Sequence, residues 1–345
     1  MGAEKIVIYK WEDIQEFFNQ KLILGNGASI AIWDKFSYDS LLQQAISEGF
    51  IKENLIEVFN KFKTQDFERV LRLLLEAYNV NMLLGIQENM TFELYKNLRN
   101  SLIRIIRVIH PEHDSVKDHL LLIARFMKKF ETVINLNYDL MVYWAMMDYL
   151  DKHPYSFKDA FIHDGKFESD FEFLRRPYGK AKSPTLVFYP HGNLILATEL
   201  FGNEIKLYRA NEEIFLLKNI MEKWEQDNCT PLFISEGTTE EKLQAIKRSD
   251  YLDTVYDSVL KSPTVNAVTF GWSFRDEDDH IIRALVEGGI GKLAVSVYTE
   301  AGASEEYCNW VKYKIEKIHR QMHRENKCDI MFFDASSKAC WNNCE

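Results

Sequence analysis

At 345 residues, 46% of them hydrophobic, the chain is long enough to bury a sizeable core in one large domain or two closely joined ones. Its net charge of −10, with no long run of lysine and arginine, argues against direct nucleic-acid binding. It has no apolar run of about 18 residues, no secretory signal and only five scattered cysteines, so we expect a cytoplasmic protein without a membrane span.

The first informative stretch is a short apolar strand that ends in a glycine turn. Residues 21–24 (KLIL) predict a buried strand, after which Gly25, Gly27 and Ser29 lead into a helix. Such a turn can bring backbone N–H groups up to a phosphate, because glycine has no Cβ to block the approach and tolerates positive φ. We therefore expect the N–H groups of Gly25 and Gly27 to face a diphosphate, although an ordinary tight turn has the same pattern.

A long helical stretch follows the glycine turn. Apolar residues recur there at helical spacing, as in the face formed by Phe67, Val70, Leu71 and Leu74. No convincing strand pattern occurs in this stretch, whereas a simple nucleotide fold would have only a short crossover at this point. We expect residues 40–130 to form a helical insertion, packed on a domain built from residues 1–39 and 131–345.

Strand patterns return at residues 132–139 and 185–190 and then alternate with helical patterns to the end of the chain. The later expected strands are residues 231–234, 266–270, 292–298 and 329–333. This alternation predicts an α/β fold, with a parallel sheet covered by helices on both faces. Ligands of such sheets bind beyond the carboxyl ends of the strands. We therefore expect one rim to hold the loops at Gly25, Asn137, His191, Ser235 and Gly271.

Three of these loops carry side chains that could take part in a reaction or contact a ligand. Asn137 and Asp139 end a strand, although Asn and Asp are also favoured as helix N-caps. His191 stands where an apolar strand stops, and Gly192 removes bulk beside it, which would let a ligand approach. The loop that starts at Gly271 runs into the acidic stretch 276–279, which would repel a phosphate. We expect that loop to contact a sugar or base.

The order of these pieces resembles the sirtuin family. Residues 25–29 (GNGAS) look like its nucleotide loop, and residues 137–139 (NYD) look like its asparagine–x–aspartate motif. Residues 191–192 (HG) look like its histidine–glycine pair, and residues 271–276 (GWSFRD) resemble its glycine–aromatic–serine loop. The resemblance covers roughly residues 21–39 and 130–335 and looks closest to a bacterial group catalogued only as a domain of unknown function. It implies a nicotinamide adenine dinucleotide (NAD) site in a Rossmann-like sheet.

By this resemblance Asn137 and His191 are the catalytic pair, with Asp139 beside them. We expect the nucleotide to contact Gly25, Asn26, Gly27, Ala28, Ser29, Tyr38, Gly192, Ser235, Glu236, Gly271, Trp272, Ser273, Phe274 and Asp276.

Two other activities are disfavoured, one by a departure from the family and one by an incomplete dinucleotide fingerprint. Deacylating sirtuins carry two Cys-x-x-Cys pairs for a structural zinc, whereas Cys340 and Cys344 here are too widely spaced and have no second pair, so we expect no metal. Peptide deacylation is therefore disfavoured. A dehydrogenase is disfavoured because Ile30 replaces the third glycine of its fingerprint and Glu48 lies in a predicted helix, where it ends no strand.

The resemblance also implies cleavage of NAD, whose nicotinamide is a cationic, ready leaving group. Asn137 could orient water or a ribose hydroxyl, His191 could accept a proton, and Asp139 could favour positive charge or merely cap a helix. We expect an NAD glycohydrolase that forms nicotinamide and ADP-ribose; the resemblance to the bacterial branch suggests an anti-phage defence effector. An ADP-ribosyltransferase, a non-catalytic sensor of NAD or ADP-ribose, and a scaffold remain alternatives. The apolar helical faces suggest a homo-oligomer, with room for an unidentified activator or partner protein.

Overall fold

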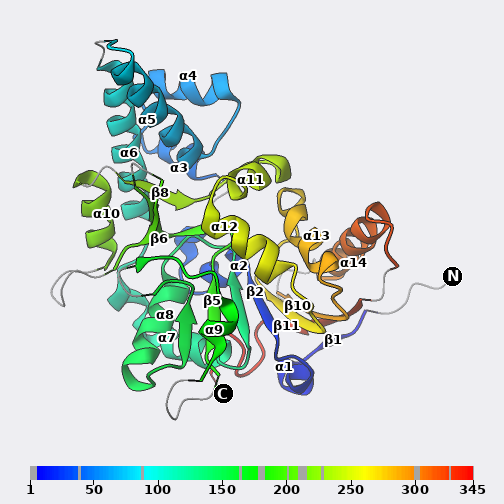
Figure 1. Cartoon of the computed structure of the whole chain (residues 1–345). Helices are drawn as coiled ribbons and strands as arrows, with labels where there is room; N and C mark the ends of the chain where they lie inside the picture. Colours follow the sequence, from blue (N-terminus) through cyan, green and yellow to red (C-terminus); the bar gives the residue numbers. More distant parts are fainter. Residues whose placement is uncertain are drawn as a thin grey trace.

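The computed structural model describes residues 6–37, 40–86, 89–162, 165–177, 183–199, 202–208, 216–226, 229–298, 304–325 and 328–344. Eight strands form one sheet in the order β1-β11-β10-β9-β2-β3-β5-β4, and every neighbouring pair is parallel (Figure 1). In chain order the strands are β1 (Ile8–Tyr9), β2 (Lys21–Leu24), β3 (Thr132–Asn135), β4 (Phe157–Asp159), β5 (Thr185–Phe188), β9 (Asn266–Phe270), β10 (Lys292–Val297) and β11 (Asp329–Asp334).

The central six strands have the order of a dinucleotide-binding sheet. When β2 is counted as the first strand, β5-β3-β2-β9-β10-β11 reads 3-2-1-4-5-6, with β4 and β1 added at the two edges. The predicted Rossmann-like α/β fold with a parallel sheet is thereby confirmed. In this order the chain leaves the centre in opposite directions from β2 and β9, and their carboxyl ends flank the crevice where such sheets bind ligands.

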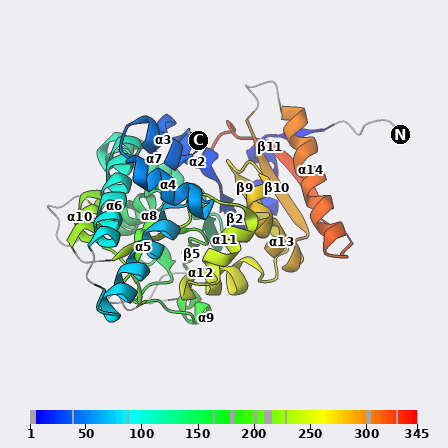
Figure 2. The same ribbon diagram turned by 90° about the horizontal axis from the view of Figure 1, so that it is seen from above.

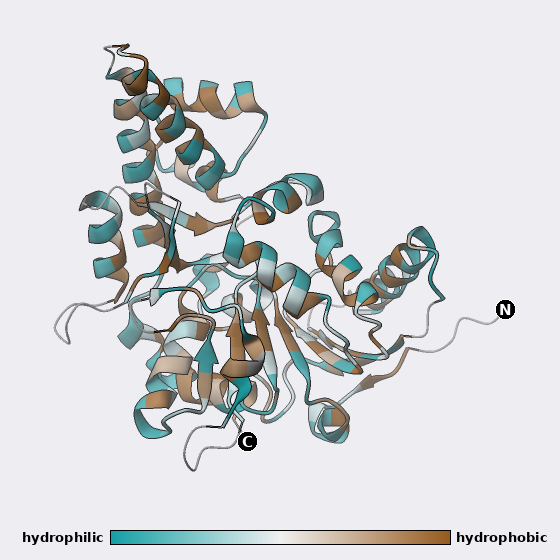
Figure 3. Cartoon of the chain, in the orientation of Figure 1, coloured by the Kyte–Doolittle hydropathy of each residue, from teal (hydrophilic) through white to brown (hydrophobic). Residues whose placement is uncertain are grey.

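Helices cover the two faces of the sheet because the crossovers run in opposite directions. Right-handed crossovers place the helices of the two halves on opposite faces. The β3 side carries α7 (His113–Met127) and α8 (Met141–Lys152), and the β10 side carries α13 (Asp279–Glu287) and α14 (Ser304–Gln321). Figure 2 shows these two pairs separated by the central strands. Every residue of β2, β3 and β5 is consequently buried, as their apolar sequences require, and Figure 3 shows hydrophobic strands at the centre.

The stretch between β2 and β3 is helical, as predicted. After α2 (Asn26–Ile30) it contains α3 (Leu41–Ser47), α4 (Glu53–Phe62), α5 (Phe67–Leu83), α6 (Met90–Ile109) and α7, and the described residues between 40 and 130 include no strand. The antiparallel pair α5 and α6 extends away from the sheet in Figure 1. Among the described helices, none is both long and apolar enough to cross a membrane.

One expected strand belongs to a different sheet. Residues 231–234 were expected in the parallel sheet, whereas β8 (Thr230–Phe233) pairs antiparallel with β6 (Gly192–Thr198), which also pairs with β7 (Glu204–Lys206). The difference arises because β6 follows β5 after a tight turn and leaves the parallel sheet, taking β8 as its partner. The remaining helices are α1 (Trp11–Ile14), α9 (Phe171–Arg175), α10 (Leu216–Gln226), α11 (Thr239–Ile246) and α12 (Asp250–Val255).

Candidate functional site

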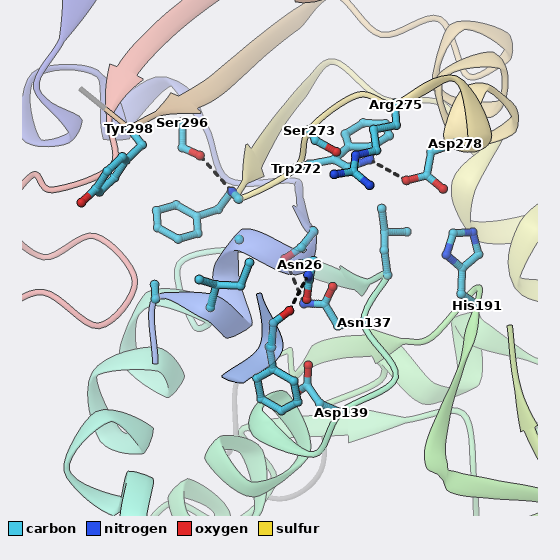
Figure 4. A pocket seen from close by; sticks show the side chains of 18 of the residues that line it. Asn26, Asn137, Asp139, His191, Trp272, Ser273, Arg275, Asp278, Ser296 and Tyr298 are labelled. Carbon is cyan, nitrogen blue, oxygen red and sulfur yellow. Dashed lines mark hydrogen bonds between the residues drawn. The ribbon is translucent and has the colours of Figure 1, made fainter. Parts of the chain in front are cut away.

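A cavity of about 1050 Å³ lies at the carboxyl ends of the central strands. All five loops that the sequence places on one rim contribute to its lining, namely those at Gly25, Asn137, His191, Ser235 and Gly271. In the view of Figure 4, His191 and Asp278 lie at one end, Ser296 and Tyr298 lie at the other, and Asn137 lies between them. A cavity of this size is at the upper end of the range for small-molecule sites, so it has room for a dinucleotide.

The glycine turn after β2 is locked against the loop after β9. Gly25 donates its N–H to the carbonyl of Phe270 at 3.0 Å, and Gly27 donates to the carbonyl of Gly271 at 2.7 Å. The expectation that these two N–H groups face a diphosphate is therefore wrong, because the protein itself satisfies both. A Cβ on Gly25 would lie 2.6 Å from Trp272 Cα, and one on Gly27 would lie 2.8 Å from Gly271 Cα. The glycines are required by this backbone contact.

Gly271 completes the contact from the other side. Its φ is +66°, and a Cβ there would lie 2.2 Å from the backbone nitrogen of Ala28. Its own N–H donates to Ser296 Oγ at 2.9 Å, which ties the loop to the end of β10. Three glycines thus bring the ends of β2 and β9 closer together than any other residue would allow.

Asn137 is fixed by two hydrogen bonds from its amide nitrogen. Its Nδ2 donates to the carbonyl of Gly25 and to Ser29 Oγ, both at 2.9 Å. Because a backbone carbonyl can only accept, the atom facing Gly25 must be the nitrogen, which fixes the orientation of the amide. The two protons of that nitrogen are thereby used within the protein. The side chain of Asn137 can therefore offer a ligand only its amide oxygen, Oδ1, which accepts a hydrogen bond from a hydroxyl or from water.

Asp139 supports Asn137 from behind and also begins a helix. One carboxylate oxygen accepts from Ser29 Oγ at 2.5 Å, and the other accepts from the N–H of Met141, the first residue of α8, at 2.9 Å. Burial raises the pKa of Asp139, although these two donors oppose the shift. Asp139 therefore satisfies the N–H of the first residue of α8, although the N-cap residue itself is Leu140, and it simultaneously holds Ser29, which accepts from Asn137.

Two further asparagines brace the loop that carries Asn137. Asn135 Nδ2 donates to the backbone carbonyl of Asn137 at 3.1 Å, and Asn193 Nδ2 donates to the backbone carbonyl of Asp139 at 2.7 Å. These side chains satisfy backbone groups of an irregular, buried segment, which would otherwise be costly to bury. The sequence prediction did not include either residue. Asn193 could have been identified from its place within an apolar strand, since a buried asparagine there usually bonds to the backbone, and Asn193 is fully buried.

His191 faces a second buried histidine. Its Nε2 lies 2.8 Å from Nε2 of His280, a residue of α13 that the sequence prediction missed. Burial lowers the pKa of His191 to about 4, with a further decrease from Lys242. Burial likewise lowers the pKa of His280, and His191 lowers it further. Both rings are therefore neutral near pH 7, the form in which an imidazole can accept a proton.

An ion pair stands beside the two histidines. Asp278 accepts from Lys242 Nζ at 2.7 Å through one oxygen and from Trp272 Nε1 at 3.1 Å through the other. Burial alone would raise the pKa of Asp278, but Lys242 and the histidines hold it below its usual value. The ligand atoms of His191, Asp278 and His280 lie within 4.8 Å of one another, which is a metal-compatible spacing. The Lys242 ammonium disfavours a second cation here; absence of a metal stays a prediction.

Several other residues predicted to bind the nucleotide also line the cavity. They are Asn26, Glu236, Trp272 and Ser273. Ser235 also lines the cavity, and its Oγ is buried without a hydrogen-bond partner. Glu236 accepts from Ser40 Oγ at 2.9 Å and from the N–H of Leu41, and so links the cavity to the start of α3.

The remaining predicted contacts lie behind the cavity wall or elsewhere. The missing side chain of Gly192 faces the backbone of β8, since a Cβ would lie 2.1 Å from the Leu232 carbonyl oxygen, so the glycine serves packing and gives no approach to a ligand. Asp276 pairs with Lys314 on α14 at 2.5 Å. Ala28, Ser29 and Phe274 are buried behind the lining residues, and Tyr38 lies outside the described residues.

Arg275 is a lining residue that the sequence prediction overlooked. It follows Trp272 and Ser273 in the same loop, and its side chain is drawn with theirs in Figure 4. A guanidinium presents several donors in a planar fork that matches a phosphate group. The sequence does contain a signal for Arg275, because a single positive charge stands directly before the acidic residues 276–279.

Comparison with known families gives one match. A family profile with the description "Domain of unknown function (DUF4917)" matches residues 22–341. No curated protein matches the chain. The matched region begins in β2 and extends past β11, so it includes all five loops that line the cavity.

The contact between the glycine turns predicts a large stability cost for Gly271→Ala. The alanine would adopt a left-handed backbone, at about 1–2 kcal/mol, and would also overlap the backbone of Ala28, at about 1–3 kcal/mol more. Gly49→Ala is the matched control, because Gly49 has a φ of +69° with nothing within 4 Å of its Cβ position. Urea unfolding should show the larger loss for Gly271→Ala. Equal losses for the two variants would contradict the contact.

Proposed function

The chain belongs to the DUF4917 family, and we propose that it is an NAD glycohydrolase that cleaves NAD to nicotinamide and ADP-ribose. The observation that carries this proposal is the meeting of Asn137, His191 and the glycine turn in one cavity, at the crevice of a 3-2-1-4-5-6 sheet. The resemblance of the four loop motifs to sirtuins, stated above, supports NAD as the ligand.

The proposed reaction breaks the bond between C1′ of the ribose and the nicotinamide nitrogen. The bonding electron pair leaves with neutral nicotinamide, and the ribose becomes an oxocarbenium ion. Water then adds to C1′ and releases one proton, so NAD and water give nicotinamide, ADP-ribose and a proton. In this scheme the carbonyl oxygen of Asn137 accepts a hydrogen bond from the water or a ribose hydroxyl, and neutral His191 takes up the proton.

The diphosphate needs a partner other than Gly25 and Gly27. Arg275 offers a guanidinium at the cavity, and the N–H of Asn26 opens α2, where the first amides have no acceptor within the helix. These two groups are our candidates for the diphosphate. Trp272 and Ser273 in the same loop would contact a base or sugar.

A specific observation favours a second candidate function, that of a sensor that binds NAD without cleaving it. The Nε2 of His191 lies 2.8 Å from Nε2 of His280 and is thus engaged within the protein. This nitrogen cannot accept a proton from a ligand until the contact with His280 is replaced. Both functions use the same cavity, so measurement of turnover separates them.

The hydrolase proposal predicts that Asn137→Ala and His191→Ala lower nicotinamide release much more than they lower NAD affinity. Loss of a general base costs about 10²–10⁴-fold in rate. Affinity should change little, because it rests on the diphosphate and adenosine contacts. Nicotinamide release and calorimetric NAD binding, measured on the same proteins, give the comparison. Parent protein that binds NAD but releases no nicotinamide would favour the sensor.

The Asn137–Ser29–Asp139 network predicts that Asp139→Asn also lowers the rate. An amide has one acceptor oxygen in place of two, so either Ser29 or the Met141 N–H loses its acceptor, at about 1–3 kcal/mol. Asn137 would then be misplaced, and nicotinamide release should fall while NAD affinity persists. The control is Asp170→Asn, which keeps an N-cap on α9. Unchanged release by Asp139→Asn would reduce Asp139 to a helix cap.

The turn between α5 and α6 supports the expected homo-oligomer. It exposes a group of large apolar side chains, here called the hairpin patch: Val80, Met82, Leu83, Leu84, Ile86 and Met90. Leu83 is 88% exposed within this group, and a contiguous exposed apolar patch is typical of an interaction surface. We infer that this patch lies between copies of the chain.

A double substitution, Leu83→Glu with Leu84→Glu, should therefore shift the protein toward the monomer, because paired carboxylates cannot be buried in an apolar contact. Light scattering at micromolar concentration measures the mass. Tyr313→Glu on α14, where the side chain is also exposed, serves as the control. A parent protein that is already monomeric and fully active would contradict the assembly proposal.

A further inference from the structure

The ring of His110 reaches the loop that carries Asn137 from the helical stretch. His110 directly follows α6, and its Nε2 accepts from the backbone N–H of Leu140 at 3.1 Å. A backbone N–H can only donate, so this ring nitrogen carries no proton. The Nδ1 lies 2.8 Å from the carbonyl of Pro111, which can only accept. These two hydrogen bonds assign His110 a proton on Nδ1 and a lone pair on Nε2.

The surroundings of His110 keep its ring neutral and in place. The side chain is buried, and burial lowers its pKa to about 4. Phe36 and Trp144 pack nearly perpendicular to the imidazole, with ring centroids 5.5 Å and 5.1 Å away. Phe36 itself lines the cavity, so His110 lies directly behind the cavity wall.

The end of α6 has supports other than this imidazole. The backbone N–H of His110 donates to the Ile106 carbonyl at 2.8 Å, a bond that any residue except proline could make. Trp33 Nε1 donates to the Ile109 carbonyl at 3.0 Å and ties the same segment to the residues after α2. The bond from Leu140, in contrast, requires a side chain with an acceptor. The imidazole therefore acts on the loop.

The loop depends on having an acceptor for Leu140. This residue lies between Asp139 and the first residue of α8, and it is fully buried. An unpaired N–H is costly in such a place, so the loop should shift when the acceptor is lost. The shift would reach the cavity, because Asp139 holds Ser29 and Ser29 accepts from the amide of Asn137.

We propose that His110 is a positioning residue, whose Nε2 accepts from Leu140 and thereby fixes Asn137 for its role toward the ligand. This inference deepens the proposed function and rests on it for the reaction that Asn137 serves. A displaced amide oxygen would orient water or a ribose hydroxyl poorly, whereas NAD affinity depends on other contacts. Loss of the acceptor should therefore lower kcat and leave NAD affinity nearly unchanged.

Three substitutions separate the two bonds of the ring. His110→Gln carries an amide about as far along the side chain as Nε2, so its oxygen can still accept from Leu140. His110→Asn carries its amide near the place of Nδ1, so it can still donate to Pro111 but is too short to reach Leu140. His110→Phe keeps a ring and removes both bonds.

Nicotinamide release and calorimetric NAD binding are measured on all three proteins. In His110→Asn and His110→Phe, kcat should fall about 10- to 100-fold, the effect expected when a buried donor loses its acceptor. His110→Gln should restore most of the parent rate. The matched control is His113→Phe: His113 also packs on Trp144, at 5.3 Å, but its Nε2 bonds to Asp148, which is not among the described residues that line the cavity. This control should keep the parent rate.

NMR without added NAD tests the bond itself. The Leu140 amide proton should exchange with solvent faster in His110→Asn and His110→Phe than in the parent or His110→Gln. The side-chain amide signals of Asn137 should move in the same two variants. Parent protein that releases no nicotinamide would refute the proposed hydrolase, while these two measurements still decide whether His110 holds the loop.

Three results would overturn the inference. One is an unchanged Leu140 exchange rate and unchanged Asn137 signals in His110→Phe. Another is equal nicotinamide release by His110→Asn and His110→Gln, since the bond to Leu140 would then have no effect. The third is a loss of NAD affinity as large as the loss of kcat, which would assign His110 to the stability of the whole fold. If His110→Phe does not fold, the comparison of His110→Asn with His110→Gln still decides.

Discussion

The backbone contact between the turns after β2 and β9 is the constraint on which the rest of the site depends. Gly25, Gly27 and Gly271 leave no room for a Cβ, and their N–H groups are bonded to the protein. This contact holds the ends of the two central strands at a fixed separation. Asn137 then reaches the Gly25 carbonyl from β3, so the loop that carries the candidate catalytic amide is built directly on the glycine contact.

Polar side chains buried behind the cavity wall determine what its lining residues can do. The Gly25 carbonyl and Ser29 Oγ take up both donors of the Asn137 amide and leave it an acceptor, whereas His280 engages Nε2 of His191. For buried groups, where the local dielectric is low, such bonds are strong, and an unsatisfied group is costly. The two residues that resemble a catalytic pair therefore differ in readiness: Asn137 can bind a hydroxyl at once, and His191 must first exchange a partner.

The helical layer contacts the cavity through a few charged groups. Glu236 lines the cavity and accepts from the first residues of α3, and Arg69 on α5 pairs with Glu241 on α11 at 2.8 Å. Lys242, next to Glu241, holds Asp278 beside the two histidines. A shift of α5 would therefore move Arg69 and Glu241, and through the neighbouring Lys242 it would disturb the ion pair with Asp278. This connection is a physical route by which the proposed assembly at the hairpin patch would affect the cavity.

The sequence by itself determined the parallel sheet, the helical stretch and the loops at its rim, because apolar periodicity and glycine placement are local properties. It could not determine which groups those glycines face, since Gly27 and Gly271 are 244 positions apart and either a phosphate or a backbone explains a missing Cβ equally well. Only the tertiary structure decided that Gly192 packs on β8 and that Asp276 pairs with Lys314, away from the cavity. It alone brought His280 to His191, because a buried histidine on an amphipathic helix has no sequence signature and its partner is fixed by the packing of distant elements.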